Sequence, residues 1–64
     1  MAFSDADRAK IIKALDKIDD AAQEAILATL TAFRNWLSDV LYGVYKRIRD
    51  DIAKIWKIIR NIFW

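Results

Sequence analysis

Cysteine, histidine and proline are absent from this chain, and glycine occurs once. Without cysteine there can be no disulfide, thiolate nucleophile or zinc cage. Without histidine the commonest general base and the commonest metal ligand are both missing. A single glycine excludes a glycine-rich phosphate loop. We therefore expect a non-enzymatic protein without a catalytic residue, a metal, a cofactor or a small-molecule substrate.

Apolar side chains make up 56% of the 64 residues, above the roughly 45–50% of ordinary domains. Residues 1–64 are expected to form one domain, which is small for burying so much apolar surface. We expect part of that surface to meet a second copy or a membrane. The absence of proline, cysteine and histidine is also typical of engineered helical scaffolds.

The start of the chain is acidic, unlike the basic start of a secretory signal. The longest uncharged stretch, Ala25 to Phe33, is far shorter than the roughly 18 residues of a spanning helix. We expect neither a leader nor a membrane span, which leaves the location open between the cytoplasm and leaderless secretion.

Helix-forming residues dominate the chain, so the predicted fold is all-α. Ser4 is a candidate N-cap for a first helix over about residues 5–18, whose apolar positions recur at steps of three and four. Asp20 is the expected cap of the next helix, with Gln23 completing a capping box. The alternative is that Asp19 and Asp20 lie on the solvated face of one uninterrupted helix.

Beyond residue 20, a seam of apolar residues continues at heptad spacing without losing phase, past Gly43. This predicts one long helix over about residues 20–62, bent or broken near Gly43 and about 65 Å long if it is continuous. A three-helix bundle, with breaks near residue 43 or at Asp50-Asp51, is the alternative. A short first helix cannot cover so long a partner, so the continuous version requires a second chain.

The leading prediction is a helical hairpin that self-associates into a multi-chain bundle, with a scaffolding or assembly role. Its partner would be another copy of the chain. The residues predicted to form the interface are Ile26, Leu30, Phe33, Trp36, Leu37, Val40, Leu41, Tyr45, Ile48, Ile52, Ile55, Trp56, Ile59 and Ile62.

Charge is distributed unevenly along the chain. Residues 1–24 carry six acids against four bases, whereas residues 44–64 carry six bases against two acids. On a helix, the cations of the C-terminal segment lie opposite its apolar arc. The simplest interpretation is an apolar face that packs on another helix, with the cations solvated.

A membrane surface is the alternative partner, because lysine and arginine on one face with tryptophan on the other are typical of interfacial helices. The ending Lys57-Ile58-Ile59-Arg60-Asn61-Ile62-Phe63-Trp64 resembles cationic, Trp-rich antimicrobial peptides and leaderless bacteriocins, in composition and over about 20 residues. The resemblance implies membrane activity. The residues predicted to face lipid are Lys54, Trp56, Lys57, Arg60, Phe63 and Trp64.

Nucleic-acid binding is disfavoured. Aromatic side chains that stack on bases should lie among the cations, yet Tyr45 and Trp56 fall on the apolar arc.

Overall fold

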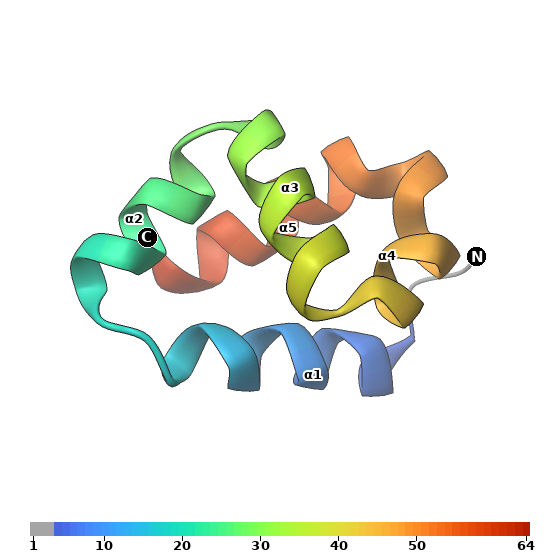
Figure 1. Cartoon of the computed structure of the whole chain (residues 1–64), viewed down its shortest axis with the longest axis horizontal. Coiled ribbons are helices and arrows are strands. Elements are labelled where there is room, and N and C mark those ends of the chain that lie inside the picture. The colour runs from blue at the N-terminus through green and yellow to red at the C-terminus, as the bar shows by residue number, and fades with distance from the viewer. Residues whose placement is uncertain (1–3) are drawn as a thin grey trace.

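The computed structural model describes residues 4–64, and these residues form helices without any strand. The helices, which Figure 1 shows in chain order, are α1 (Asp5–Asp16), α2 (Asp20–Ala28), α3 (Leu30–Val40), α4 (Tyr42–Ile48), the 3-10 turn η1 (Arg49–Asp51) and α5 (Ile52–Phe63). The all-α prediction is confirmed.

The first helix begins where its cap was expected. The Ser4 hydroxyl accepts a hydrogen bond from the backbone N–H of Asp7 at 3.1 Å. The predicted end near residue 18 is close to the observed end at Asp16. A short link then leads into α2.

The cap of α2 is Asp19 rather than Asp20, because the Asp19 carboxylate accepts the N–H of Ala22 at 2.8 Å. The predicted capping box does not form. The Gln23 side chain instead donates to the carbonyl of Leu15 at 2.7 Å. That carbonyl belongs to the last turn of α1 and also accepts the backbone N–H of Ile18 at 3.3 Å, so the added bond from Gln23 ties α2 to α1.

Residues 20–62 do not form one continuous helix: the sequence predicted a bend or break near Gly43, but it did not predict a break at Thr29. The chain leaves helical geometry at Thr29, whose hydroxyl caps α3 by accepting the N–H of Ala32 at 3.1 Å. It does so again at Leu41, where φ is −132° and ψ is 60°. Gly43 lies inside α4, so this break comes two residues before the expected one. The region of Asp50 and Asp51, also considered as a break, forms η1.

The breaks allow the apolar sides of the short helices to pack against one another within one chain. A straight helix of 43 residues cannot cover its own apolar side, whereas short segments can turn theirs toward a common centre. The described residues fill a body of 30 × 21 × 20 Å, in which α1 lies along one side and α3 packs on α5 (Figure 1). The buried core is Ile11, Leu15, Leu27, Phe33, Leu37, Val44, Ile48, Ile52, Ile55 and Ile59.

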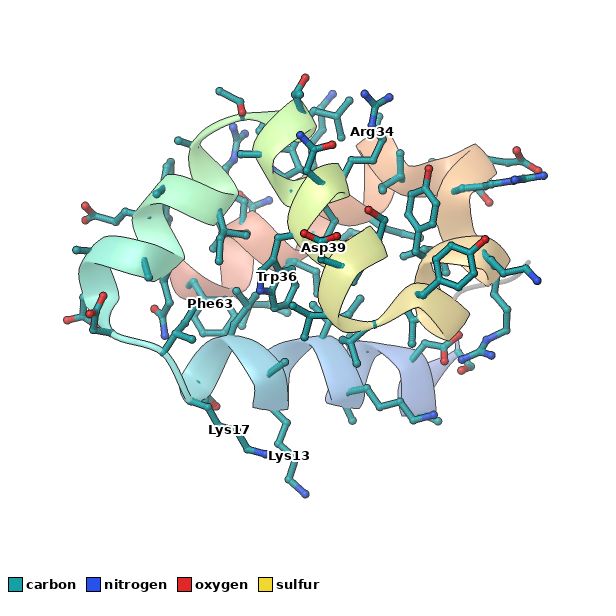
Figure 2. All side chains as sticks on the ribbon, viewed as in Figure 1. Lys13, Lys17, Arg34, Trp36, Asp39 and Phe63 are labelled. Atoms are coloured by element: carbon teal, nitrogen blue, oxygen red, sulfur yellow. The ribbon has the colours of Figure 1, made fainter. Side chains whose placement is uncertain are left out.

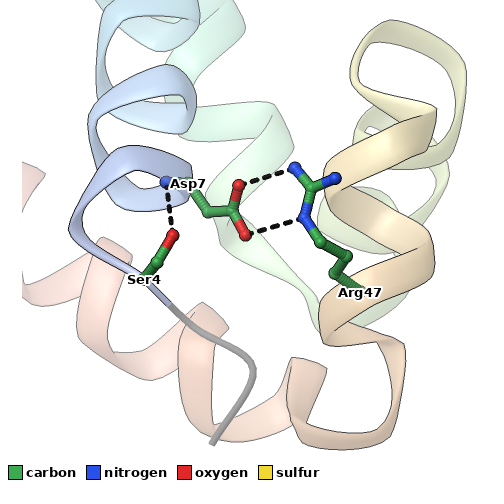
Figure 3. Close-up of polar contacts among 3 residues, drawn as sticks. All are labelled: Ser4, Asp7 and Arg47. Carbon is green, nitrogen blue, oxygen red and sulfur yellow. Dashed lines mark hydrogen bonds and ion pairs between the residues drawn. The ribbon is translucent and has the colours of Figure 1, made fainter.

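An ion pair joins α1 to α4 (Figure 3). The Arg47 Nε donates to Asp7 Oδ2 at 3.1 Å, and Nη2 donates to Oδ1 at 2.7 Å. The Asp7 side chain is 4% exposed and that of Arg47 is 51% exposed. The hydrogen bonds from Arg47 hold the pKa of the Asp7 carboxyl below its ordinary value of 3.8, against the opposing effect of burial.

Loss of this pair at low pH should loosen α1. Because the pKa of Asp7 is lower in the folded chain than in the unfolded chain, its contribution is complete above the unfolded value and is lost as pH falls through the folded one. Urea unfolding of Asp7→Asn at pH 7 should show a free energy of unfolding about 1–2 kcal/mol lower, because Arg47 is half exposed. The loss of stability below about pH 4 should also be smaller in this variant than in the wild type.

Asp5→Asn is the matched control for Asp7→Asn. Asp5 also lies in the first turn of α1, and its carboxylate is fully exposed at 3.7 Å from Arg8. Its unfolding midpoint should stay near that of the wild type. Equal effects of the two substitutions would contradict a specific role for the Asp7–Arg47 pair.

Candidate functional site

Most of the residues predicted to form an oligomer interface are covered by the chain itself. Six of them are buried in the core: Phe33, Leu37, Ile48, Ile52, Ile55 and Ile59. Six more are partly buried against this core: Ile26, Leu30, Trp36, Leu41, Tyr45 and Trp56. The remaining two, Val40 and Ile62, are exposed. One of the two reasons to expect a second chain was an unbroken long helix, and the breaks remove that reason. A single chain does not test self-association, which stays a prediction.

Large apolar side chains are exposed at two places among residues 4–64. The first is the junction of α3 and α4, where Val40 is 54% and Tyr42 is 59% exposed. The second is the C-terminal turn of α5, where Ile62 is 49% and Trp64 is 63% exposed. The two places differ in the charged side chains that surround the exposed apolar residues.

The α3–α4 junction carries charges of both signs. Asp39 is exposed beside Val40, and the Lys46 Nζ lies 5.7 Å from the centre of the Tyr42 ring. The Tyr42 ring also stacks on Tyr45, with ring centroids 6.2 Å apart. Mixed charge of this kind favours neither an anionic nor a cationic partner.

The end of α5 is built around an arginine between two indoles. The Arg60 Cζ lies 4.5 Å from the centre of the Trp56 ring and 6.0 Å from that of Trp64. The three residues are spaced four apart, so they lie on one side of the helix. Both distances are within cation–π range.

A hydrogen bond fixes the inner indole of this cluster. The Trp56 Nε1 donates to the carbonyl of Leu27 at 2.9 Å. Leu27 lies in the last turn of α2, whose carbonyls have no partner within the helix. Trp56 therefore joins α5 to α2 and sets the place of Arg60. Sequence reasoning assigned Trp56 to apolar contact and missed this bond, although a buried indole N–H usually finds an acceptor.

The cations around this cluster are unpaired among the described residues. Lys54 and Lys57 are exposed and Arg60 is partly exposed, and none makes an ion pair within residues 4–64. One acid is close, because Glu24 lines a shallow hollow together with Ala28 and Trp64.

The structure separates the six residues predicted to face lipid. Lys54, Lys57 and Trp64 are exposed, and Trp56 and Arg60 are partly covered. Phe63 packs against the core, and Figure 2 shows it turned toward the interior of the bundle. The structure thus brings Trp56, Arg60 and Trp64 together, with Lys57 on the same side of α5, whereas Phe63 is turned away from them. We call Trp56, Lys57, Arg60 and Trp64 the indole–cation cluster.

Comparison with protein-family models, with curated proteins and with solved structures finds no match. Within residues 4–64, no helix is long and apolar enough to cross a membrane. The same residues contain no group of three or more acidic side chains placed to hold a metal ion.

Proposed function

We propose that this protein is non-enzymatic and binds anionic membrane surfaces through the last turns of α5. The observation that supports this most strongly is the indole–cation cluster, where exposed Trp64 lies beside Arg60, which makes no ion pair within residues 4–64. Tryptophan is enriched at the headgroup level of bilayers, and lysine and arginine are attracted to anionic lipid. The composition of the C-terminal segment supports the same interpretation.

Binding of the closed bundle should be reversible. Each cation near an anionic surface contributes about 1 kcal/mol, so Lys54, Lys57 and Arg60 give moderate affinity that salt weakens. The apolar face of α5 (Ile52, Ile55 and Ile59) is part of the core. Deeper insertion therefore requires α5 to leave the bundle, and this opening would give the protein membrane-disrupting activity.

Vesicle titrations followed by tryptophan emission test the binding. Phosphatidylcholine vesicles with about 30% phosphatidylglycerol should bind the chain at least about tenfold more strongly than phosphatidylcholine alone, and about 0.5 M salt should abolish the difference. Release of an entrapped dye reports the opening. An unchanged emission spectrum together with no co-flotation would contradict the proposal.

Removing charge at two places shows which surface docks. Lys54→Gln with Lys57→Gln should weaken binding to the anionic vesicles by roughly ten- to thirtyfold. Lys13→Gln with Lys17→Gln removes the same charge from one exposed residue of α1 and from the exposed residue that follows this helix, and both side chains point away from the bundle in Figure 2. That control should change binding by less than about threefold, because screening limits charges held away from the surface. Equal losses would contradict docking through α5.

Self-association is the second candidate function. Ala21, Ala25 and Ala28 form an exposed row of small side chains on α2, and such a row permits close approach of another helix. We propose it as a weaker assembly mode of the closed bundle. Light scattering coupled to size-exclusion chromatography tests it, and one chain per particle at about 100 μM would contradict it.

A further inference from the structure

We propose, on the basis of the membrane-binding function above, that Arg60 is the residue that binds the lipid phosphate. Its guanidinium, held between Trp56 and Trp64, would receive the phosphate of an anionic phospholipid headgroup, with Lys57 beside it. The specific partner is thus a phosphodiester at a membrane surface.

The state of Arg60 differs from that of the arginines held by carboxylates. Arg47 is bound by Asp7 through two hydrogen bonds, and Arg8 lies 3.7 Å from Asp5. Arg60 makes no ion pair within residues 4–64, and its contacts there are with the two indole rings. A guanidinium packed on aromatic rings keeps the N–H donors at its edge available, and those donors match the geometry of phosphate oxygens.

The position of the guanidinium is set before any ligand arrives. Trp56 is anchored to α2 by its bond to the Leu27 carbonyl, and the guanidinium packs 4.5 Å from the centre of that anchored ring. A preorganised donor loses less side-chain freedom on binding than a flexible lysine does. The affinity for anionic lipid should therefore depend on the paired N–H donors of the Arg60 guanidinium and not on its charge alone.

The exposed indole of Trp64 indicates that the phosphate comes from a membrane. Trp64 is 63% exposed and lies beside Arg60, so it would enter the headgroup region as the guanidinium reaches the phosphates. A soluble phosphate would leave this apolar surface in water. Lys57 lies three residues before Arg60 and adds a second positive charge on the same side.

The substitution Arg60→Lys keeps the positive charge and removes the paired N–H donors of the guanidinium. With the anionic vesicles described above, the partition constant of the full chain should fall about five- to tenfold. The slope of binding against salt should stay the same, because it reports the number of charges. Arg34→Lys is the matched control, since Arg34 is exposed on α3 and makes no cation–π contact with an indole among the described residues. Binding by that control should change by less than about twofold.

A second variant tests the indole that completes the site. Trp64→Leu keeps an apolar side chain and removes one side of the cluster, and it should weaken binding more than Ile62→Leu in the same turn. The indole N–H resonance of Trp56 verifies the fold of each variant, because its hydrogen bond to Leu27 requires α5 to be docked on α2.

The outcomes separate the inference from the function that it rests on. If the wild-type chain binds and Arg60→Lys binds equally well, Arg60 is one point charge among several and the inference fails while the function stands. If the wild-type chain does not bind, the proposed function fails first. Binding of glycerol 3-phosphate to the chain without vesicles, as tight as binding to the anionic vesicles and lost in Arg60→Lys, would assign the site to a soluble phosphate and overturn the assignment to lipid.

Discussion

Ile55→Asp should leave the chain unfolded at neutral pH. Ile55 is fully buried at the end of the first turn of α5, among the core residues Ile52 and Ile59. The substitution removes a buried apolar side chain and places a carboxylate where no partner can solvate it, so the loss should be about 5 kcal/mol or more. A 64-residue chain has about 3–10 kcal/mol of stability in total. Circular dichroism should show loss of most helix signal.

Ile62→Asp is the matched control for Ile55→Asp. It makes the same chemical change on the same helix, at a side chain that is 49% exposed. The carboxylate stays in water there, and its unfavourable position near the end of α5 costs less than about 1 kcal/mol. The control should therefore keep its helix signal and a cooperative thermal transition. An Ile55→Asp chain as stable as the Ile62→Asp control would contradict the burial of this face within one molecule.

Phe33→Ala should lower the free energy of unfolding by about 3–5 kcal/mol. Phe33 is a fully buried residue of α3, and its ring packs beside Trp36 with centroids 6.2 Å apart and planes tilted by 34°. Removing the ring leaves a cavity that so small a bundle cannot fill without moving α3. Urea denaturation followed by circular dichroism measures the loss.

Phe33→Leu separates the effect of volume from that of the aromatic ring. Leucine refills much of the space, so this variant should lose about 1.5 kcal/mol or less. Near-ultraviolet circular dichroism should show that the environment of Trp36 changes in both variants. Equal stability of the alanine and leucine variants would contradict tight packing around Phe33.

Local signals in the sequence predict the composition of the core better than the path of the chain. Six of the residues predicted to form the interface are buried, because steps of three and four remain correct within each short helix. They are Phe33, Leu37, Ile48, Ile52, Ile55 and Ile59. The same phase also fits one continuous helix, so spacing alone could not place the breaks. The break at Thr29 depends on a threonine hydroxyl capping α3, and the break at Leu41 has no side-chain cap.

The contacts that define the candidate site connect distant parts of the sequence. Trp56 donates to the carbonyl of Leu27, and Arg47 donates to Asp7. The spacing of apolar residues along the sequence cannot predict contacts between helices so far apart in the chain. The sequence does place Trp56, Arg60 and Trp64 four residues apart, which is enough to align them on a helix. It also placed Phe63 in the lipid-facing set by composition, whereas tertiary packing turns Phe63 to the core.

Quenching of single tryptophans by lipid tests most directly the claim that the chain docks through the end of α5. One protein keeps Trp64 alone through Trp36→Phe and Trp56→Phe, and a second keeps Trp36 alone, which is partly buried against the core. In anionic vesicles with brominated acyl chains, Trp64 emission should be quenched, while Trp36 emission stays near its value in buffer. Quenching of Trp36 without quenching of Trp64 would contradict this claim.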